Sequence, residues 1–217
     1  MSLLPPSASV ALPVDGPKLH SPSAQRNAPA IVALLREVAP PEGRALEIAS
    51  GTGQHVVAMA AALPALTWQP TDITPDRLAS IDAYAAEAAL PNLHPAQHLD
   101  AARDGWAVTH ALYDLIYLGN LLHLIPMPAA QAVLTGAAAA LAPEGTLVIY
   151  GPFMRAGRLT SDGDRTFDSD LRAANPDIGY KDDTWVAAVL GAAGLRHQIT
   201  RDMPANNLGI IARRTLP

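Results

Sequence analysis

Along most of this chain, short apolar runs alternate with stretches of helical spacing. Apolar residues at helical spacing predict a first helix from about residue 27 to 38, with Pro29 in its first turn. The apolar run over residues 44–50 predicts a buried strand. The same patterns predict further strands over 66–69, 94–99, 112–118 and 145–150, and further helices over 56–63, 75–90, 131–141 and 183–191. Strands that alternate with helices indicate a parallel sheet covered on both faces.

The end of the chain departs from this alternation. Two apolar runs, 197–201 and 208–213, are joined by residues 202–207 with no helical pattern between them, which predicts an antiparallel hairpin at the sheet edge. We therefore predict an α/β fold with seven mostly parallel strands, a C-terminal antiparallel hairpin and helices on both faces. This Rossmann-like arrangement resembles that of class I S-adenosylmethionine (SAM)-dependent methyltransferases, whereas ordinary dinucleotide-binding folds keep a parallel sixth strand.

The chain has 217 residues, which is enough for one well-packed domain, expected over residues 21–217. Residues 1–20 are rich in proline and serine and predict a loose N-terminal arm. Residues 151–182 lack a strong period and are too many for an ordinary connection. We therefore expect them to form a lid that contains a short helix.

Composition and charge narrow the range of functions. The net charge is −5 and no run of Lys or Arg occurs, which argues against a nucleic-acid partner. The chain has no cysteine, which excludes cysteine-ligated metals, and its histidines show no metal-ligand spacing. No stretch reaches the roughly 18 apolar residues of a membrane helix, and the first residues do not resemble a signal peptide. We expect a cytoplasmic protein that binds no metal, no membrane and no nucleic acid.

The sequence from residue 46 to 53, LEIASGTG, carries the pattern Glu-x-x-x-Gly-x-Gly at the end of a predicted strand. Two glycines let the backbone approach a ligand without a Cβ clash, and the following helix offers free N–H groups. Asp72, which follows the next strand, can accept hydrogen bonds from the ribose hydroxyls of SAM or of NAD. Val56 stands where a dinucleotide fingerprint has a third glycine, which counts against NAD. A tight turn without a ligand is the simpler alternative.

Several further segments occur together with this pattern. They are Arg26-Asn27, residues 46–55 (LEIASGTGQH), Trp68-Gln69-Pro70 with Asp72, Asn120 with His123, Tyr150-Gly151-Pro152-Phe153, Thr160-Ser161, Phe167-Asp168, Leu171-Arg172 and Met203-Pro204-Ala205-Asn206-Asn207. The set resembles the uncharacterised class I methyltransferase-like family that includes human methyltransferase-like protein 26, from about residue 21 to the C-terminus. The resemblance implies the class I fold and binding of SAM, with S-adenosylhomocysteine (SAH) as product. It implies no particular methyl acceptor.

The fold and the resemblance together suggest roles for individual residues. The residues expected to bind the cofactor are Glu47, Ala49, Gly51, Thr52, Gly53, His55, Asp72, Ile73, Asp100, Ala101 and Asn120. Those expected to orient or deprotonate the acceptor are His123, Tyr150, Arg26 and Asn207. Those expected to form the lid and the acceptor side are Asn27, Phe153, Ser161, Phe167, Asp168, Arg172 and Asn206. Packing is an alternative role for both histidines, and helix capping is an alternative for Asp72.

These observations predict a SAM-dependent methyltransferase that acts on a small-molecule acceptor. Catalysis would rest mainly on alignment and on exclusion of water, because the sulfonium is already an activated methyl donor. Two alternatives stay open at this point. One is a non-catalytic module that binds SAM or SAH and works through a protein partner. The other is an NAD(P)-dependent oxidoreductase.

Overall fold

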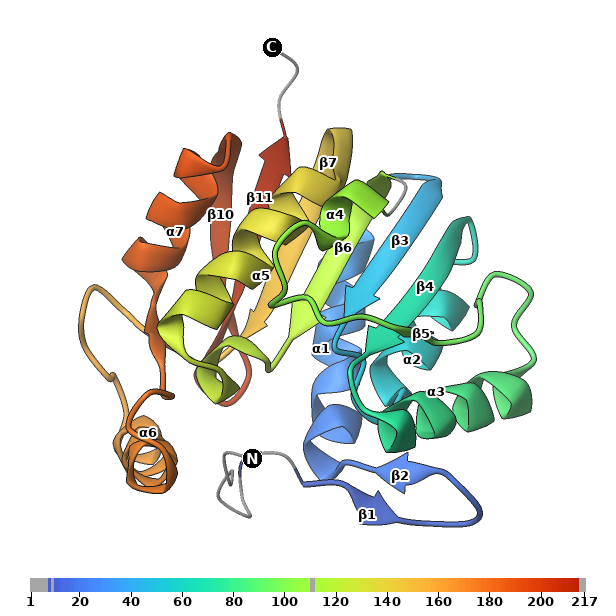
Figure 1. Ribbon diagram of the computed structural model, residues 1–217, viewed down its shortest axis with the longest axis horizontal. Coiled ribbons are helices and arrows are strands. Elements are labelled where there is room, and N and C mark those ends of the chain that lie inside the picture. Colours follow the sequence, from blue (N-terminus) through green and yellow to red (C-terminus); the bar gives the residue numbers. More distant parts are fainter. Residues whose placement is uncertain (1–7, 9, 110–111, 215–217) are drawn as a thin grey trace.

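The computed structural model of the chain describes residues 8, 10–109 and 112–214. Within these residues, seven strands form one central sheet in the order β10-β11-β7-β6-β3-β4-β5 (Figure 1). The strands are β3 Gly43–Ile48, β4 Leu66–Asp72, β5 Gln97–His98, β6 Tyr113–Gly119, β7 Leu141–Gly151, β10 Leu195–Met203 and β11 Asn207–Arg214. The first five are parallel, and β11 pairs antiparallel with both β7 and β10. The predicted α/β sheet with a C-terminal antiparallel hairpin is confirmed.

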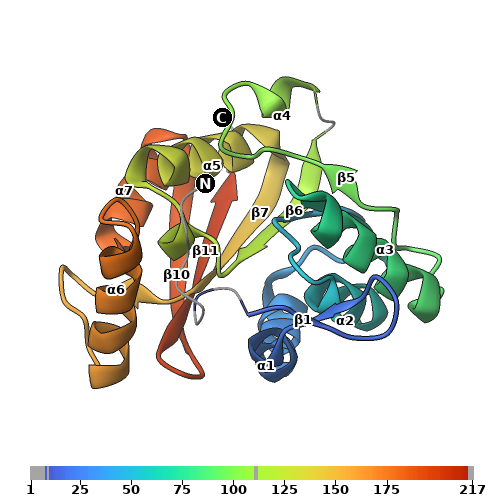
Figure 2. The same ribbon diagram turned by 60° about the horizontal axis from the view of Figure 1, so that its bottom comes forward.

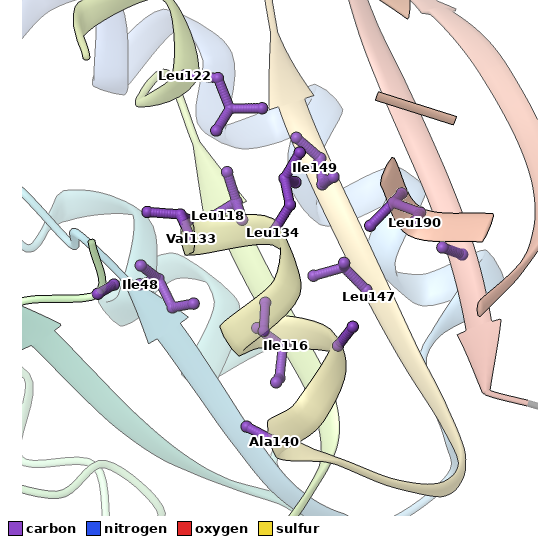
Figure 3. Close-up of a cluster of buried hydrophobic side chains, with 14 of the residues drawn as sticks. Ile48, Ile116, Leu118, Leu122, Val133, Leu134, Ala140, Leu147, Ile149 and Leu190 are labelled. Atoms are coloured by element: carbon purple, nitrogen blue, oxygen red, sulfur yellow. The ribbon is translucent and has the colours of Figure 1, made fainter. Parts of the chain in front are cut away.

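Helices cover both faces of the sheet (Figure 1). One face carries α1 Pro22–Val38, α2 Gln54–Ala62 and α3 Pro75–Ala88, and the other carries α4 Trp106–Thr109, α5 Met127–Ala140 and α7 Asp183–Ala192. Strand residues alternate between the two apolar cores, so Leu118 of β6 packs toward α5 while Tyr117 packs toward α1 and α2. Figure 3 shows the first core, with Leu134 of α5 against Leu118 and Ile149. Burial on both faces explains why these strands are continuous apolar runs in the sequence.

Helix α1 begins at Pro22, ahead of the predicted start near residue 27. Ser21 provides the N-cap, because its Oγ accepts a hydrogen bond from the Ala24 N–H at 3.3 Å. Pro22 occupies the first helical position. A backbone N–H at this position would have no partner within the helix, so the absence of an N–H in proline costs no hydrogen bond. Pro29 lies inside the helix and not in its first turn. The prediction was wrong because Pro29 was given the role of Pro22, although Ser21 ahead of Pro22 is the stronger helix-start signal.

The remaining differences from the predicted elements are smaller. Of the predicted strand 94–99, only Gln97–His98 is a strand, and Pro95 just before it has no N–H to donate to a ladder. Strand β7 begins at Leu141, directly after α5, and α5 itself begins at Met127. The single-turn helix α4 was not predicted. No described helix combines the length and the apolar character that a bilayer crossing requires.

Residues 12–20, part of the segment for which we expected a loose arm, form a hairpin of β1 Leu12–Pro13 and β2 Leu19–His20. The hairpin is attached to α3, since Ser80 Oγ accepts a hydrogen bond from the Leu19 N–H at 2.9 Å. Lys18 pairs with Glu87 and lies 5.4 Å from the ring centroid of Tyr84. This part of the segment is therefore a packed element of the domain.

The segment expected to form a lid, residues 151–182, contains a short helix as predicted. Its elements are β8 Phe153–Met154, α6 Asp162–Ala174 and β9 Lys181–Asp182, with β9 parallel to β8. Helix α6 begins with a capping box between Ser161 and Asp164. Figure 2 shows α6 alongside the turn between β10 and β11. There the Asn206 side-chain amide donates to Thr160 Oγ at 2.8 Å and to the Asp164 carboxylate.

The packing of α2 against α3 predicts different effects for two glycine substitutions. Gly53 has φ +91°, and a Cβ placed on it would lie 2.8 Å from Ile81 Cα. Gly53→Ala should therefore lower the free energy of unfolding by about 1–3 kcal/mol. In α7, a Cβ on Gly191 meets no atom within 4 Å, so Gly191→Ala should be neutral or stabilising by up to about 1 kcal/mol. Urea unfolding of both variants checks this, and equal losses would contradict the proposed close contact.

Candidate functional site

The carboxyl ends of β3, β4 and β6 meet at one edge of the sheet, which is where parallel α/β folds bind ligands. A cleft of about 410 Å³ opens at this edge. Its walls include the loops that follow the three strands, at residues 49–52, 72–74 and 119–121. The first turn of α1 and the side chains of Leu124 and Ile125 also line the cleft.

The loop after β3 has an unusual backbone, with φ of +55° at Ala49, +61° at Gly51 and +91° at Gly53. A Cβ placed on Gly51 meets no atom within 4 Å, so the space that a side chain would take belongs to the open cleft. Gly53, in contrast, lies close to the backbone of α3. The two glycines of the motif therefore serve different purposes: Gly51 leaves room in the cleft, and Gly53 lets α2 pack.

Asp72 joins the loops that follow β3 and β4. Its Oδ2 accepts a hydrogen bond from the Gly51 N–H at 3.0 Å. Its Oδ1 accepts from the N–H groups of Ile73 at 2.8 Å and Thr74 at 3.1 Å. The carboxylate thus fixes the Gly51 backbone and the turn that precedes α3, whose N-cap is Thr74, and the same side chain lines the cleft. Thr74 Oγ1 also donates to Oδ1 at 3.3 Å, so Asp72 already accepts about as many hydrogen bonds as a carboxylate can, and a ligand hydroxyl at Asp72 would replace one of them.

Beneath the cleft, Glu47 of β3 is 2% exposed, and its Oε2 has no hydrogen-bond partner among the residues described. Burial raises the pKa of this carboxyl group to about 8, while a hydrogen bond with Ser50 acts in the opposite direction. Tyr117 of β6 stands directly beside Glu47 in the sheet register, and its buried hydroxyl also lacks a described partner. Unpaired polar atoms of this kind cost about 1–3 kcal/mol each, which points to a use in a ligand-bound state.

His55, in the first turn of α2, lines the cleft with its tautomer fixed. Its Nε2 lies 3.1 Å from the Ala24 carbonyl oxygen, which can only accept, so Nε2 carries the proton. Burial lowers the pKa of the imidazole to about 4, and the ring is therefore neutral at pH 7. The ring also meets Tyr117 edge-on, with centroids 6.4 Å apart. His55 holds α1 against α2 at the cleft wall.

The structure brings together most of the residues predicted to bind the cofactor. Seven of them line the cleft: Ala49, Gly51, Thr52, His55, Asp72, Ile73 and Asn120. Glu47 and Gly53 lie directly behind this lining. Asp100 lines a separate cavity of about 390 Å³ instead, and Ala101 is buried in the core on the α5 face. These two residues follow β5, where the Leu99 N–H donates to the carbonyl oxygen of Asp72 at 3.0 Å.

The four residues predicted to act on the acceptor do not line the cleft. His123 is 4% exposed and packs against the rings of Phe167 and Tyr180, with centroids 5.7 Å and 6.2 Å away. Burial lowers the pKa of His123 to about 3. Tyr150 is buried beneath α1, and its hydroxyl accepts a hydrogen bond from the Asn207 side chain at 3.0 Å. Arg26 is exposed on α1.

Of the residues predicted for the lid, some hold the segment 151–182 together and others link it to the rest of the domain. Asp168 accepts hydrogen bonds from Arg172 Nε and from the Tyr180 N–H, both at 2.7 Å. Ser161 caps α6, Phe153 is buried in the core on the α5 face, and Phe167 packs on His123. Asn206 bonds to the lid, and Asn27 is half-buried on α1. The segment 151–182 thus packs on the loop after β6 through Phe167 and His123.

Sequence reasoning missed three groups of residues at the cleft. They are Ser21 and Ser23 in the first turn of α1, Leu124 and Ile125 after β6, and Ala8 with Val10 in the N-terminal segment. The Ser-Pro-Ser start of α1 was a usable signal, but no local pattern shows that Ala8 and Val10 line the cleft. Among the residues described, no three His, Asp or Glu side chains are grouped so that they could hold a metal ion.

Comparisons with known proteins match the chain to one family and to several solved structures of similar fold. Residues 18–214 match the family described as "Protein of unknown function (DUF938)". Among solved structures, the chain is similar to an O-methyltransferase family protein from Burkholderia thailandensis (TM-score 0.75, 20% identity, 88% of this chain and 57% of that one). It is also similar to an O-methyltransferase family 2 protein from Planctomyces limnophilus in complex with apigenin (TM-score 0.74, 18% identity, 89% and 58%). Human N-acetylserotonin methyltransferase in complex with SAM is a third (TM-score 0.71, 16% identity, 88% and 52%).

At these identities the likeness shows the fold. The α/β fold of the chain is that of class I methyltransferases, and its structural neighbours are SAM-dependent methyltransferases and O-methyltransferases. The chain spans little more than half the length of these neighbours.

The raised pKa of Glu47 predicts a pH dependence of stability. Between about pH 4.5 and pH 8 the folded chain keeps a proton on Glu47 that the unfolded chain has released, so this group makes the protein less stable as pH rises through that range. Glu47→Gln has no such proton to lose. Relative to the parent, the variant should gain roughly 1 kcal/mol per pH unit across the range. Urea unfolding at several pH values checks this, with exposed Glu42→Gln as control; a constant difference at all pH values would contradict the raised pKa.

Proposed function

We propose that this chain, which belongs to the protein family of unknown function DUF938, is a SAM-dependent methyltransferase with a small-molecule acceptor. The observation that carries the proposal is the loop after β3. There Gly51 presents a bare backbone to the cleft, and its N–H is held by Asp72 from the neighbouring strand. A glycine turn and a carboxylate on adjacent strand ends are what a nucleoside ligand with a flexible tail requires.

The residues of the cleft fit such a cofactor. Asp72 would receive the ribose hydroxyls, with Ile73 beside the base, and the loop at residues 49–52 would hold the methionine part. The unpaired Oε2 of Glu47 lies behind this loop and would meet the positive charge of the amino group directly or through water. When bound, SAM supplies a methyl group on a sulfonium, which is already activated for transfer.

The work left for the protein is to orient the acceptor and to exclude water. Asn120, at the end of β6, would orient the acceptor from the cleft wall. Tyr150 and Asn207 form a hydrogen-bonded pair behind the wall and would act by positioning it, whereas Arg26 is exposed on α1 and does not line the cleft. For His123 we propose a role in fastening the lid, because its ring is enclosed by Phe167 and Tyr180.

Other features support parts of this proposal. The net charge of −5 favours a small-molecule acceptor over nucleic acid, and a chain without cysteine suits the reducing cytoplasm. The segments from Arg26-Asn27 to Asn206-Asn207 support kinship with the family of human methyltransferase-like protein 26. A non-catalytic SAM-binding module is the second candidate, favoured by the buried position of His123 and Tyr150.

Calorimetric titration with SAM, SAH and NADH tests the choice of cofactor. We expect micromolar binding of SAM and SAH and no binding of NADH, since Val56 replaces the third glycine of a dinucleotide site. Failure of both sulfur compounds to bind would overturn the proposal. Binding followed by no SAH formation with any metabolite extract would favour the non-catalytic module.

A matched pair of glycine variants tests the loop itself. Gly51 and Gly157 both have positive φ, +61° and +78°, and a Cβ on either meets no atom within 4 Å. Valine strains the backbone similarly at both positions, but only position 51 lies in the cleft. Gly51→Val should weaken SAH binding by about 10-fold or more, and Gly157→Val by less than about 2-fold. Similar SAH affinities in the two variants would show that the loop does not contact the cofactor.

A further inference from the structure

We propose that the Tyr117 hydroxyl and the Glu47 carboxyl together receive the ammonium group of the cofactor, and that Glu47 releases a proton to the solvent as this group binds. This inference rests on the proposed function, because it takes the loop after β3 as the site of the methionine part. Tyr117 is then a further binding residue, although it stands within the apolar run of β6 and belongs to no motif.

Glu47 and Tyr117 stand side by side beneath the cleft. They are partners in the parallel register of β3 and β6, and both side chains point to the face of the sheet that α1 and α2 cover. Glu47 is 2% exposed, and Tyr117 is fully buried. Glu47 Oε2 and the Tyr117 hydroxyl both lack a hydrogen-bond partner among the residues that the structure describes. Buried polar atoms are nearly always hydrogen-bonded in folded proteins, so two such atoms on paired residues point to a shared ligand group.

The Tyr117 hydroxyl lies at the floor of the cleft. A Cβ placed on Gly119, two residues further along β6, would overlap this hydroxyl, so the tyrosine occupies the space that a side chain at position 119 would fill. Gly119 itself lines the cleft, as does His55, whose ring meets Tyr117 edge-on. Because position 119 carries no side chain, a ligand group beside it can approach the hydroxyl.

An ammonium group matches both of these atoms. It has three N–H donors and a positive charge, so it can donate to Glu47 Oε2 and to the Tyr117 oxygen at the same time. A carboxylate is the partner that stabilises a buried ammonium best, because opposite charges compensate each other for the loss of water. The methionine part of SAM and of SAH carries such a group, and the loop that would hold it lies directly above Glu47.

The titratable groups on the other elements around Glu47 leave this role to the carboxyl. His55 on α2 is neutral at pH 7, because burial lowers its pKa to about 4. Burial raises the pKa of the hydroxyls of Tyr117 on β6 and Tyr150 on β7, so both are neutral as well. Asp72 on β4 acts on Glu47 as a negative charge.

Two arginines lie on the helices that cover this face. Arg26 is exposed on α1, and Arg77 lines the cleft in the first turn of α3. The pKa of Glu47 responds to burial, to Ser50 and to Asp72, and not to either arginine. The charge that Glu47 can pair with must therefore come from the ligand.

The carboxyl group of Glu47 has to lose its proton for this pairing. Burial, and to a smaller extent the negative charge of Asp72, raise its pKa to about 8, so the group is protonated at pH 7 in the free protein. A bound ammonium is an opposite charge at short range and lowers this pKa. The O–H bond then breaks, the proton passes to the solvent buffer, and the carboxylate accepts a hydrogen bond from the ammonium. The expected release at pH 7 is about one proton for each ligand bound.

Calorimetric titration of SAH into the full-length protein tests the proton release. Titrations at pH 7 in phosphate and in Tris, whose ionisation enthalpies differ, give the number of protons released per SAH. We expect about one proton for the parent and for exposed Glu42→Gln, and none for Glu47→Gln, which has no proton to lose. SAH binding by the parent without proton release, or equal release by Glu47→Gln, would overturn the inference. No binding of SAH at all would overturn the proposed function and this inference with it.

The desamino analogue of SAH, in which a hydrogen replaces the amino group, is a control that requires no variant. It brings no positive charge to Glu47, so its binding to the parent should release no proton in the same two buffers. Proton release equal to that seen with SAH would contradict the placement of the ammonium beside Glu47.

Two phenylalanine variants test the contribution of Tyr117. Tyr117→Phe removes the hydroxyl and keeps the ring, as does Tyr113→Phe at the other end of β6, on the α5 face. Tyr117→Phe should weaken SAH binding by about 5-fold or more and binding of the desamino analogue by less than about 2-fold, whereas Tyr113→Phe should change neither by more than about 2-fold. Urea unfolding should show no loss of stability in Tyr117→Phe, because its hydroxyl has no described partner to lose. Equal weakening of both ligands by Tyr117→Phe would contradict a contact with the ammonium.

Discussion

Strands β3 and β4 lie side by side and end at the same edge of the sheet, and the carboxylate of Asp72 binds the loops that leave both of them. This contact depends on the parallel register, which sets the ends of the two strands level. It binds the N–H of Gly51, which has a positive φ, and fixes the turn at residues 73 and 74 that precedes α3. Because α3 is joined to the N-terminal hairpin through Ser80, this one carboxylate links the loop after β3 to the turn before α3 and, through α3, to the hairpin.

The region beneath the cleft is polar where a domain of this size would normally be apolar. Glu47, Tyr117 and Tyr150 occupy three strands on the face covered by α1 and α2, among otherwise apolar neighbours. Their hydrogen-bonding capacity is only partly used, since Tyr150 is held by Asn207 while Tyr117 and Oε2 of Glu47 have no described partner. Stability alone would favour Phe at the two tyrosine positions and Leu or Met at position 47. Their presence indicates that this layer is arranged for a ligand.

The sheet, the glycine turn and Asp72 were predictable from sequence because each depends on a local pattern: continuous apolar runs, two glycines after a strand, and an acid after the next strand. The start of α1 was predicted wrongly although Ser21 and Pro22 carried the signal. Contacts between distant segments had no such signal. Tyr117 beside Glu47 follows from the strand register, and the enclosure of His123 by Phe167 and Tyr180 follows from how the lid folds back. Neither can be deduced from spacing along the chain.

The bond between Asn206 and the lid has a consequence for the order in which the protein is made. Strand β11 lies between β10 and β7, so a strand synthesised after both of them is inserted between them in the sheet. Asn206 and Asn207 at its start fasten α6 and Tyr150. A nascent chain that has emerged only as far as α7 therefore has its glycine turn but neither of these attachments. The turn after β3 can therefore form from β3 and β4, whereas α6 and Tyr150 acquire these bonds only after β11 has been synthesised.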